Sequence, residues 1–164
     1  MGILGIVHLA VAILAMIFGA IVIFMKKGTK THVKIGYAYV VSMVGVNVTA
    51  LMIYNLFGKF GPFHYAALIS LLSVMGGMIP AIRRKPKGRW IEMHYEFMNW
   101  SVIGLYAAFW SETFTRYFRF QGFWVLVATA TALTVAIGAY LLKSKKAQIL
   151  AVYGYTTKKG KESK

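Results

Sequence analysis

Histidine is the main residue type in this chain that could do chemistry. The chain has four histidines, no cysteine and only four acidic residues, all of them glutamates. The histidines are His8, His32, His64 and His94. Two imidazoles can supply both axial ligands of a haem iron, and imidazoles together with carboxylates can hold a divalent ion such as zinc. Without cysteine there is no thiolate metal site and no covalent haem attachment, so a bound haem would be of the b type.

The elements that must position these histidines are hydrophobic segments. Of the 164 residues, 59% are hydrophobic and 14% are charged, against roughly 45–50% and about 25% in soluble domains. Five mostly apolar runs have the length of roughly 20 residues that a membrane-spanning helix needs. They cover residues 2–25, 35–57, 63–82, 91–112 and 122–142. The sequence therefore predicts an all-α integral membrane bundle with five transmembrane helices in residues 1–143, followed by a basic tail in residues 144–164.

The distribution of lysine and arginine predicts the orientation. Four basic residues lie between the first and second runs, five between the third and fourth, and seven after the fifth. These sixteen fall on one side of a five-helix bundle, and the other side has only Lys59, Arg116 and Arg119. Because cytoplasmic loops are enriched in lysine and arginine, we expect the N-terminus outside and the tail in the cytoplasm. A four-helix bundle would leave one strongly basic loop on the wrong side.

The positive charge also indicates which kinds of partner the chain could bind. The formal net charge is +15, but the basic residues cluster between apolar runs, so we expect the lipid bilayer and no nucleic acid as the partner. Residues 147–157 are too few to cross a bilayer, and with the flanking lysines of the tail they could lie on anionic inner-leaflet lipids. Small residues recur at helical spacing and allow close helix packing. Whether copies of the chain form a homo-oligomer stays open.

The four histidines sort into two pairs by depth. His8 lies 18 residues before Lys26 and His64 lies 19 residues before Arg83, so both should lie near the outer face. His32 and His94 both lie at the inner starts of their helices. Alternate helices of a four-helix bundle face each other across its axis. The leading hypothesis is therefore an electron carrier with one or two b-type haems, one held by His8 and His64 outside and one by His32 and His94 inside.

Two other functions remain open from the residues alone. The same histidines could bind or transport a divalent, zinc-like ion, with Glu112 added to the outer pair and Glu96 to the inner pair. The chain could instead be a non-enzymatic scaffold whose tail contacts lipid. Histidines near helix ends also commonly lie hydrated among lipid headgroups and have no ligand. No hydrolase, kinase or nucleotide-binding motif is present, so the sequence does not indicate an enzyme class.

Two stretches resemble the signatures of a bacterial family of multi-pass membrane proteins catalogued as a domain of unknown function. They are KGTKTHVKIGYAY at residues 27–39, followed by Met43, and HYEFMNWS at residues 94–101. The resemblance covers residues 27–116 and implies that His32 and His94 are family positions in a bacterial plasma membrane protein. Where the family has more basic residues after the second histidine, this chain has Tyr95 and Glu96.

The arrangement of the histidines is also similar to that of two-haem membrane cytochromes of the b561 kind. In those proteins alternate helices each give one histidine to a haem at each membrane face. This second likeness is of arrangement only, and it implies haem at both faces.

Overall fold

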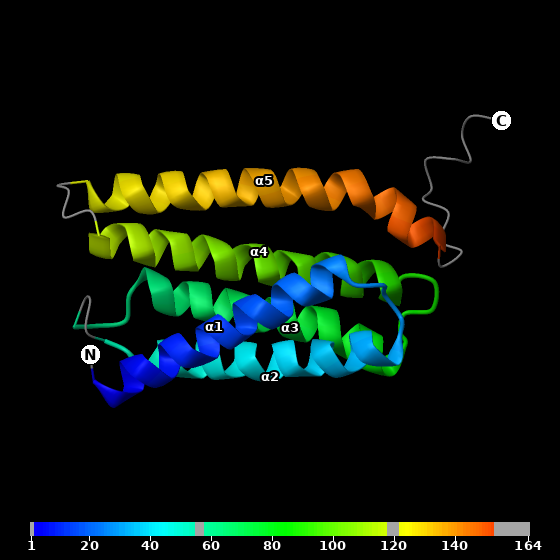
Figure 1. The fold of residues 1–164 in the computed structure, drawn as a ribbon, viewed down its shortest axis with the longest axis horizontal. Coiled ribbons are helices and arrows are strands. Elements are labelled where there is room, and N and C mark those ends of the chain that lie inside the picture. The colour runs from blue at the N-terminus through cyan, green and yellow to red at the C-terminus, as the bar shows by residue number, and fades with distance from the viewer. Residues whose placement is uncertain (1, 55–57, 118–121, 153–164) are drawn as a thin grey trace. The chain divides into compact units, whose positions relative to one another are not determined.

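The computed structural model describes residues 2–54, 58–117 and 122–152, which form five helices (Figure 1). These are α1 (Ile3–Phe24), α2 (Lys30–Met52), α3 (Pro62–Arg83), α4 (Trp90–Tyr117) and α5 (Phe123–Val152). The described residues contain no strand, so the all-α prediction is confirmed. Four helices are long and apolar enough to cross a membrane. The remaining helix, α4, has 28 residues, enough for about 42 Å of helix, but it carries three of the four glutamates of the chain.

Three helices differ by five residues or more from the predicted apolar runs. Helix α4 continues five residues past its predicted end, to Tyr117, and α2 ends at Met52, five residues before its predicted end. Helix α2 begins five residues early, at Lys30, because the hydroxyl of Thr29 caps it by accepting a hydrogen bond from the His32 amide at 3.0 Å. Helix α5 continues past Leu142 to Val152, so the basic segment after the apolar run starts as helix. The expected end of the second run at residue 57 and the tail from residue 153 lie outside the described residues.

The chain divides into two compact units, Met1–Met75 and Gly76–Lys164, with the division inside α3. In the first unit α1 and α2 pack through small residues. Ala15 and Gly19 are the buried residues of α1, and a Cβ added at Gly45 of α2 would lie 3.5 Å from Cγ1 of Val11. Small residues at such a face let two helix backbones approach closely.

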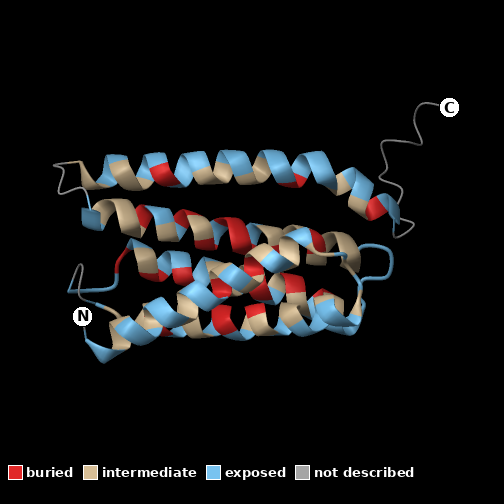
Figure 2. Cartoon of the chain, in the orientation of Figure 1, coloured by how far each residue is buried: buried red, intermediate tan, exposed pale blue. Residues whose placement is uncertain are grey.

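In the second unit α4 is the most buried helix (Figure 2). It buries eight residues, whereas α5 buries only Ala130, Leu142 and Leu150. The two helices are joined by the Tyr95 hydroxyl, which donates to the Leu142 carbonyl at 3.2 Å. Outward-facing apolar residues of α5 are strongly exposed, with Val125 at 67% and Ile137 at 62%. Exposed apolar surface on this scale is typical of a helix whose outer face contacts lipid.

Candidate functional site

His8 is joined to α2 by a hydrogen bond that fixes its ring proton. Its Nδ1 lies 2.8 Å from Oγ1 of Thr49, in the last turn of α2. The Thr49 hydroxyl also lies 2.7 Å from the Gly45 carbonyl and 3.0 Å from the Val46 carbonyl, to which it donates its only proton. With that proton on a carbonyl, we assign Nδ1 of His8 as the donor to Thr49. The neutral ring then carries its lone pair on Nε2, which is the form that binds a metal ion.

His64 has the opposite arrangement of its ring nitrogens. Its Nδ1 accepts a hydrogen bond from the amide of Gly61 at 3.1 Å. Gly61 immediately precedes Pro62, the first residue of α3, so His64 takes the place that Glu or Gln has in a capping box. Proline favours the first position of a helix, because its φ is fixed at a helical value and its missing N–H is not needed there. The cap therefore sets the direction of the His64 ring.

The other ring nitrogen of His64 is buried and has no hydrogen-bond partner within residues 2–54, 58–117 and 122–152. Because Nδ1 accepts a hydrogen bond from the Gly61 amide, the neutral ring carries its own proton on Nε2. The residue is only 3% exposed, and its ring lies between Tyr54 and Phe60 at centroid distances of 4.6 and 4.7 Å. Nε2 has no partner among the described residues. A buried polar atom without a partner costs about 1–3 kcal/mol, and such an atom in a folded protein is a candidate ligand contact.

His8 and His64 lie at the same end of α2. His8 contacts Thr49 in the last turn of this helix, and His64 packs on Tyr54, two residues after the helix ends at Met52. The start of α1 and the start of α3 thus both lie near the end of α2 within the first unit. The two histidines that the sequence pairs by depth are at this end of the unit.

His32 lies at the other end of α2, in its first turn, where its amide donates to Thr29. It belongs to the first unit and His94 to the second. The predicted inner pair of His32 and His94 therefore stays a prediction.

His94 has the same ring-proton arrangement as His8. Its Nδ1 lies 3.0 Å from the carbonyl oxygen of Gly77, which can only accept, so the ring donates this proton. Pro80, three residues later in α3, removes the backbone donor that would pair with the neighbouring Gly76 carbonyl. A Cβ at Gly77 would lie 2.7 Å from Sδ of Met98, so only glycine lets α4 come this close. Ligating histidines commonly donate their second ring N–H to a backbone carbonyl in this way.

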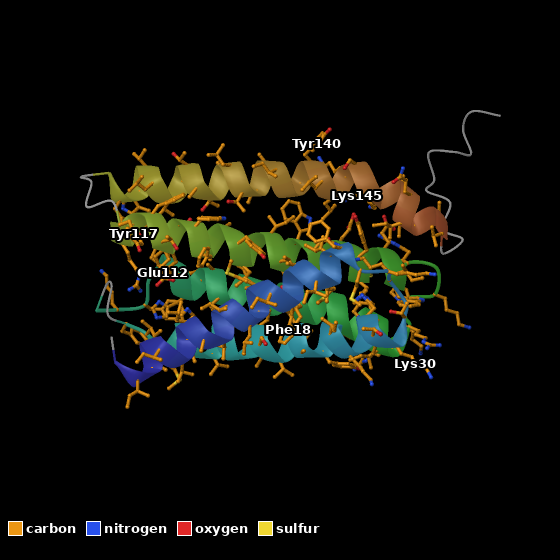
Figure 3. All side chains as sticks on the ribbon, in the orientation of Figure 1. Phe18, Lys30, Glu112, Tyr117, Tyr140 and Lys145 are labelled. Atoms are coloured by element: carbon orange, nitrogen blue, oxygen red, sulfur yellow. The ribbon has the colours of Figure 1, made fainter. Side chains whose placement is uncertain are left out.

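The glutamates that could assist a metal site are engaged in ion pairs. Glu92 and Glu96, one turn apart on α4, both accept from Nζ of Lys146 on α5, with 2.7 Å to Glu92. Glu112, at the far end of α4 (Figure 3), pairs with Arg116 one turn later. Within the part of the chain that the structure describes, no three His, Asp or Glu side chains gather as a metal-binding group. Among the described residues, the predicted metal ligands Glu96 and Glu112 therefore pair with cations and not with histidines.

Three contacts at these sites were missed from the sequence. The pattern Gly61-Pro62 with His64 two residues later is a recognisable helix start and could have been found. Thr49 and Gly77 carry no comparable signal, because they act on histidines that are 41 and 17 residues away in the chain.

Residues 5–149 match the sequence model of a family described as predicted membrane protein, DUF2306. The match covers nearly the whole chain and confirms the resemblance to a membrane family of unknown function that residues 27–116 indicate. Comparisons with curated proteins and with solved structures give no match.

Proposed function

Because the chain belongs to the DUF2306 family of predicted membrane proteins, we propose that it works within a lipid bilayer as a b-type cytochrome, with one haem held by His8 and His64. The proposal rests above all on Nε2 of His64, a buried ring nitrogen that has no hydrogen-bond partner in the part of the chain that the structure describes. His8 lies at the same end of α2 and has its ring turned so that Nε2 carries the lone pair. Two imidazole nitrogens are the full set of protein ligands that a bis-histidine haem needs, and Nε2 of His64 would have to give up its proton to serve as one of them.

The residues around the two rings fit this role with one adjustment. Thr49 holds the His8 ring through Nδ1, and Tyr54 and Phe60 hold the His64 ring from two sides. For His64 to hold a haem iron through Nε2, the ring proton would have to be on Nδ1 instead. The Gly61 amide then loses its acceptor, so haem loading should weaken the cap of α3. The haem supplies reversible one-electron chemistry.

The wider proposal is electron transfer across a bacterial plasma membrane. It includes five membrane-spanning helices, the N-terminus outside, the C-terminus inside, and a second haem on His32 and His94. The Nδ1–H of His94, donated to the Gly77 carbonyl, supports His94 as a ligand because it leaves the lone pair on Nε2. The divalent-ion alternative has less support, because Glu96 and Glu112 are paired with Lys146 and Arg116.

A visible absorption spectrum of the detergent-purified protein, before and after dithionite, tests the proposal. We expect a Soret band that sharpens on reduction, with α and β bands. His64→Gln should lose one haem per chain, because glutamine has no imidazole but can still accept from the Gly61 amide and keep the cap. Tyr65→Phe is the matched control, since this neighbour is 60% exposed. A colourless wild-type protein expressed with ample haem, or a His64→Gln protein with an unchanged spectrum and haem content, would refute the assignment.

A further inference from the structure

Basic side chains gather at one end of the second unit. We call this surface the basic end. Its members are exposed and come from the loop between α3 and α4 and from the continuation of α5: Arg83, Arg84, Lys85, Lys87, Arg89, Lys143 and Lys145. The two segments lie at the same end because Lys146 of α5 is bonded to Glu92 and Glu96 in the first turns of α4. Residues about 60 positions apart in the chain therefore form one surface.

The basic end keeps a large excess of positive charge. Its carboxylates among the described residues are Glu92 and Glu96, and Lys146 engages both of them. The seven members of the basic end are exposed, and the two acids nearby are partly neutralised. Such an excess favours binding of a polyanion or of phosphate groups.

Exposed apolar side chains lie directly beside these cations. In α3, Ile82 is 63% exposed and is followed at once by Arg83 and Arg84. In α5, Tyr140 is 73% exposed and Leu141 is 49% exposed, two or three residues before Lys143. Figure 3 shows Tyr140 on the outer face of α5. Both helices thus change from exposed apolar to exposed basic residues within a single turn.

The loop backbone has an unusual conformation at one of the cations. Arg84 has a φ of 50°, in the left-handed region that residues with a Cβ rarely adopt, and Gly88 has a φ of 84°. Glycine accepts this conformation freely, but arginine is strained in it. Strain of this kind is commonly retained where a functional contact needs a particular backbone path.

We propose that the basic end is a binding surface for anionic phospholipid, with the phosphate groups on the arginines and lysines and the acyl chains on the adjacent apolar residues. Phospholipids present a charged phosphate directly above hydrocarbon, which matches the change from apolar to basic residues in both helices. Nucleic acid has no hydrocarbon part and would leave the apolar residues beside the cations uncovered. The surface consists of the loop and the helix end, so the tail from residue 153 is not required.

Native mass spectrometry of the detergent-purified full chain with added phosphatidylglycerol or phosphatidylcholine tests the proposal. The variant Arg83→Gln/Arg84→Gln/Lys85→Gln should bind phosphatidylglycerol at least about tenfold more weakly than wild type. The control Lys26→Gln/Lys30→Gln/Lys34→Gln removes the same charge from the first unit and should bind as wild type does. A chain that ends at Val152 should also keep its affinity.

Four results would overturn this assignment. An equal loss in the two triple variants would mean that net charge alone attracts the lipid. Loss of binding on removing residues 153–164 would move the contact to the tail. Equal binding of phosphatidylcholine would exclude recognition of the anionic headgroup. If inorganic phosphate competes fully at millimolar concentration, the surface is an ion site and not a lipid site.

Discussion

His8 donates its Nδ1 proton to the hydroxyl of Thr49 across 2.8 Å, and this bond joins α1 to α2. The direction of the bond follows from the helix itself, because the Thr49 hydroxyl already donates to carbonyls one turn earlier. A short relay of hydrogen bonds, from His8 to Thr49 and from Thr49 to the α2 backbone carbonyls, therefore selects the tautomer of His8. The same relay would strengthen His8 as a ligand, since a hydrogen bond at the second ring nitrogen raises the basicity of the first.

Thr49→Val removes this acceptor while keeping a side chain of nearly the same shape. We expect the haem-free protein to lose about 0.5–1.5 kcal/mol of stability, because a part-buried N–H is left without its partner. Haem retention should fall by about tenfold, the lower end of the effect of losing such a partner in metal sites. Thermal unfolding and haem titration measure the two effects. Thr49→Ser keeps the hydroxyl and should resemble wild type; if Thr49→Val also does so, the relay has no role.

The cap of α3 gives a prediction that does not depend on any cofactor. In the haem-free protein, His64→Ala removes the acceptor for the Gly61 amide and should lower stability by about 1 kcal/mol. His64→Gln should lose much less, because glutamine at this position can accept the same N–H. Thermal melts of the two variants by circular dichroism provide the comparison. Equal losses in both would show that the ring acts only through its packing on Tyr54 and Phe60.

The sequence predicts where the helices lie, but it does not predict which ring nitrogen of each histidine carries the proton. Apolar runs and Pro62 locate the helices closely, because the length of a run and the chemistry of helix starts are local properties. The break expected after Leu142 does not occur. Lys146, Ile149 and Leu150 continue the inner face of α5 at helical spacing, and Leu150 is 1% exposed, so the charges there do not end the helix. Which nitrogen of a histidine carries the proton depends on an atom from a distant segment, and composition cannot supply that.

The contact between α4 and α5 depends on glycine at position 138. A Cβ there would lie 2.6 Å from Cγ1 of Ile103 and 2.8 Å from its Cδ1, so Gly138→Ala should cost about 1–3 kcal/mol through overpacking. Adding Ile103→Ala should recover part of this loss, which a double-mutant cycle of unfolding free energies would detect as non-additivity. Gly104→Ala is the control, because nothing lies within 4 Å of its added Cβ. Strict additivity of the two changes would mean that these residues are not in contact.

Lys146 is expected to stabilise the second unit by holding two like charges together. Its removal in Lys146→Met leaves Glu92 and Glu96 at adjacent turns of α4, where like charges four residues apart repel. The side chains are 24–41% exposed, so solvent screening should limit the loss to roughly 1 kcal/mol. Unfolding at low and high salt measures it, and the loss should shrink as salt is added. Combining Lys146→Met with Glu92→Gln and Glu96→Gln should restore most of the stability; failure to do so would assign the role of Lys146 to packing.

The crossing of the membrane by α4 can be tested with single cysteines, because the chain has none of its own. Lys87 lies in the exposed loop before α4, and Tyr117 is the last residue of α4 and is 83% exposed. If α4 crosses, Tyr117→Cys should react with a membrane-impermeant maleimide in intact cells, and Lys87→Cys should react only after permeabilisation. Lys59→Cys, on the predicted outer side, serves as the positive control.

The carboxylates of α4 do not prevent crossing, because each is paired with a cation. Lys146 neutralises part of the charge of Glu92 and Glu96 near the predicted inner end of the helix. Arg116 pairs with Glu112 near the outer end. If neither Lys87→Cys nor Tyr117→Cys reacts in intact cells while Lys59→Cys does, α4 lies on the inner side, and α5 would bring the C-terminus to the outer side, opposite to the prediction.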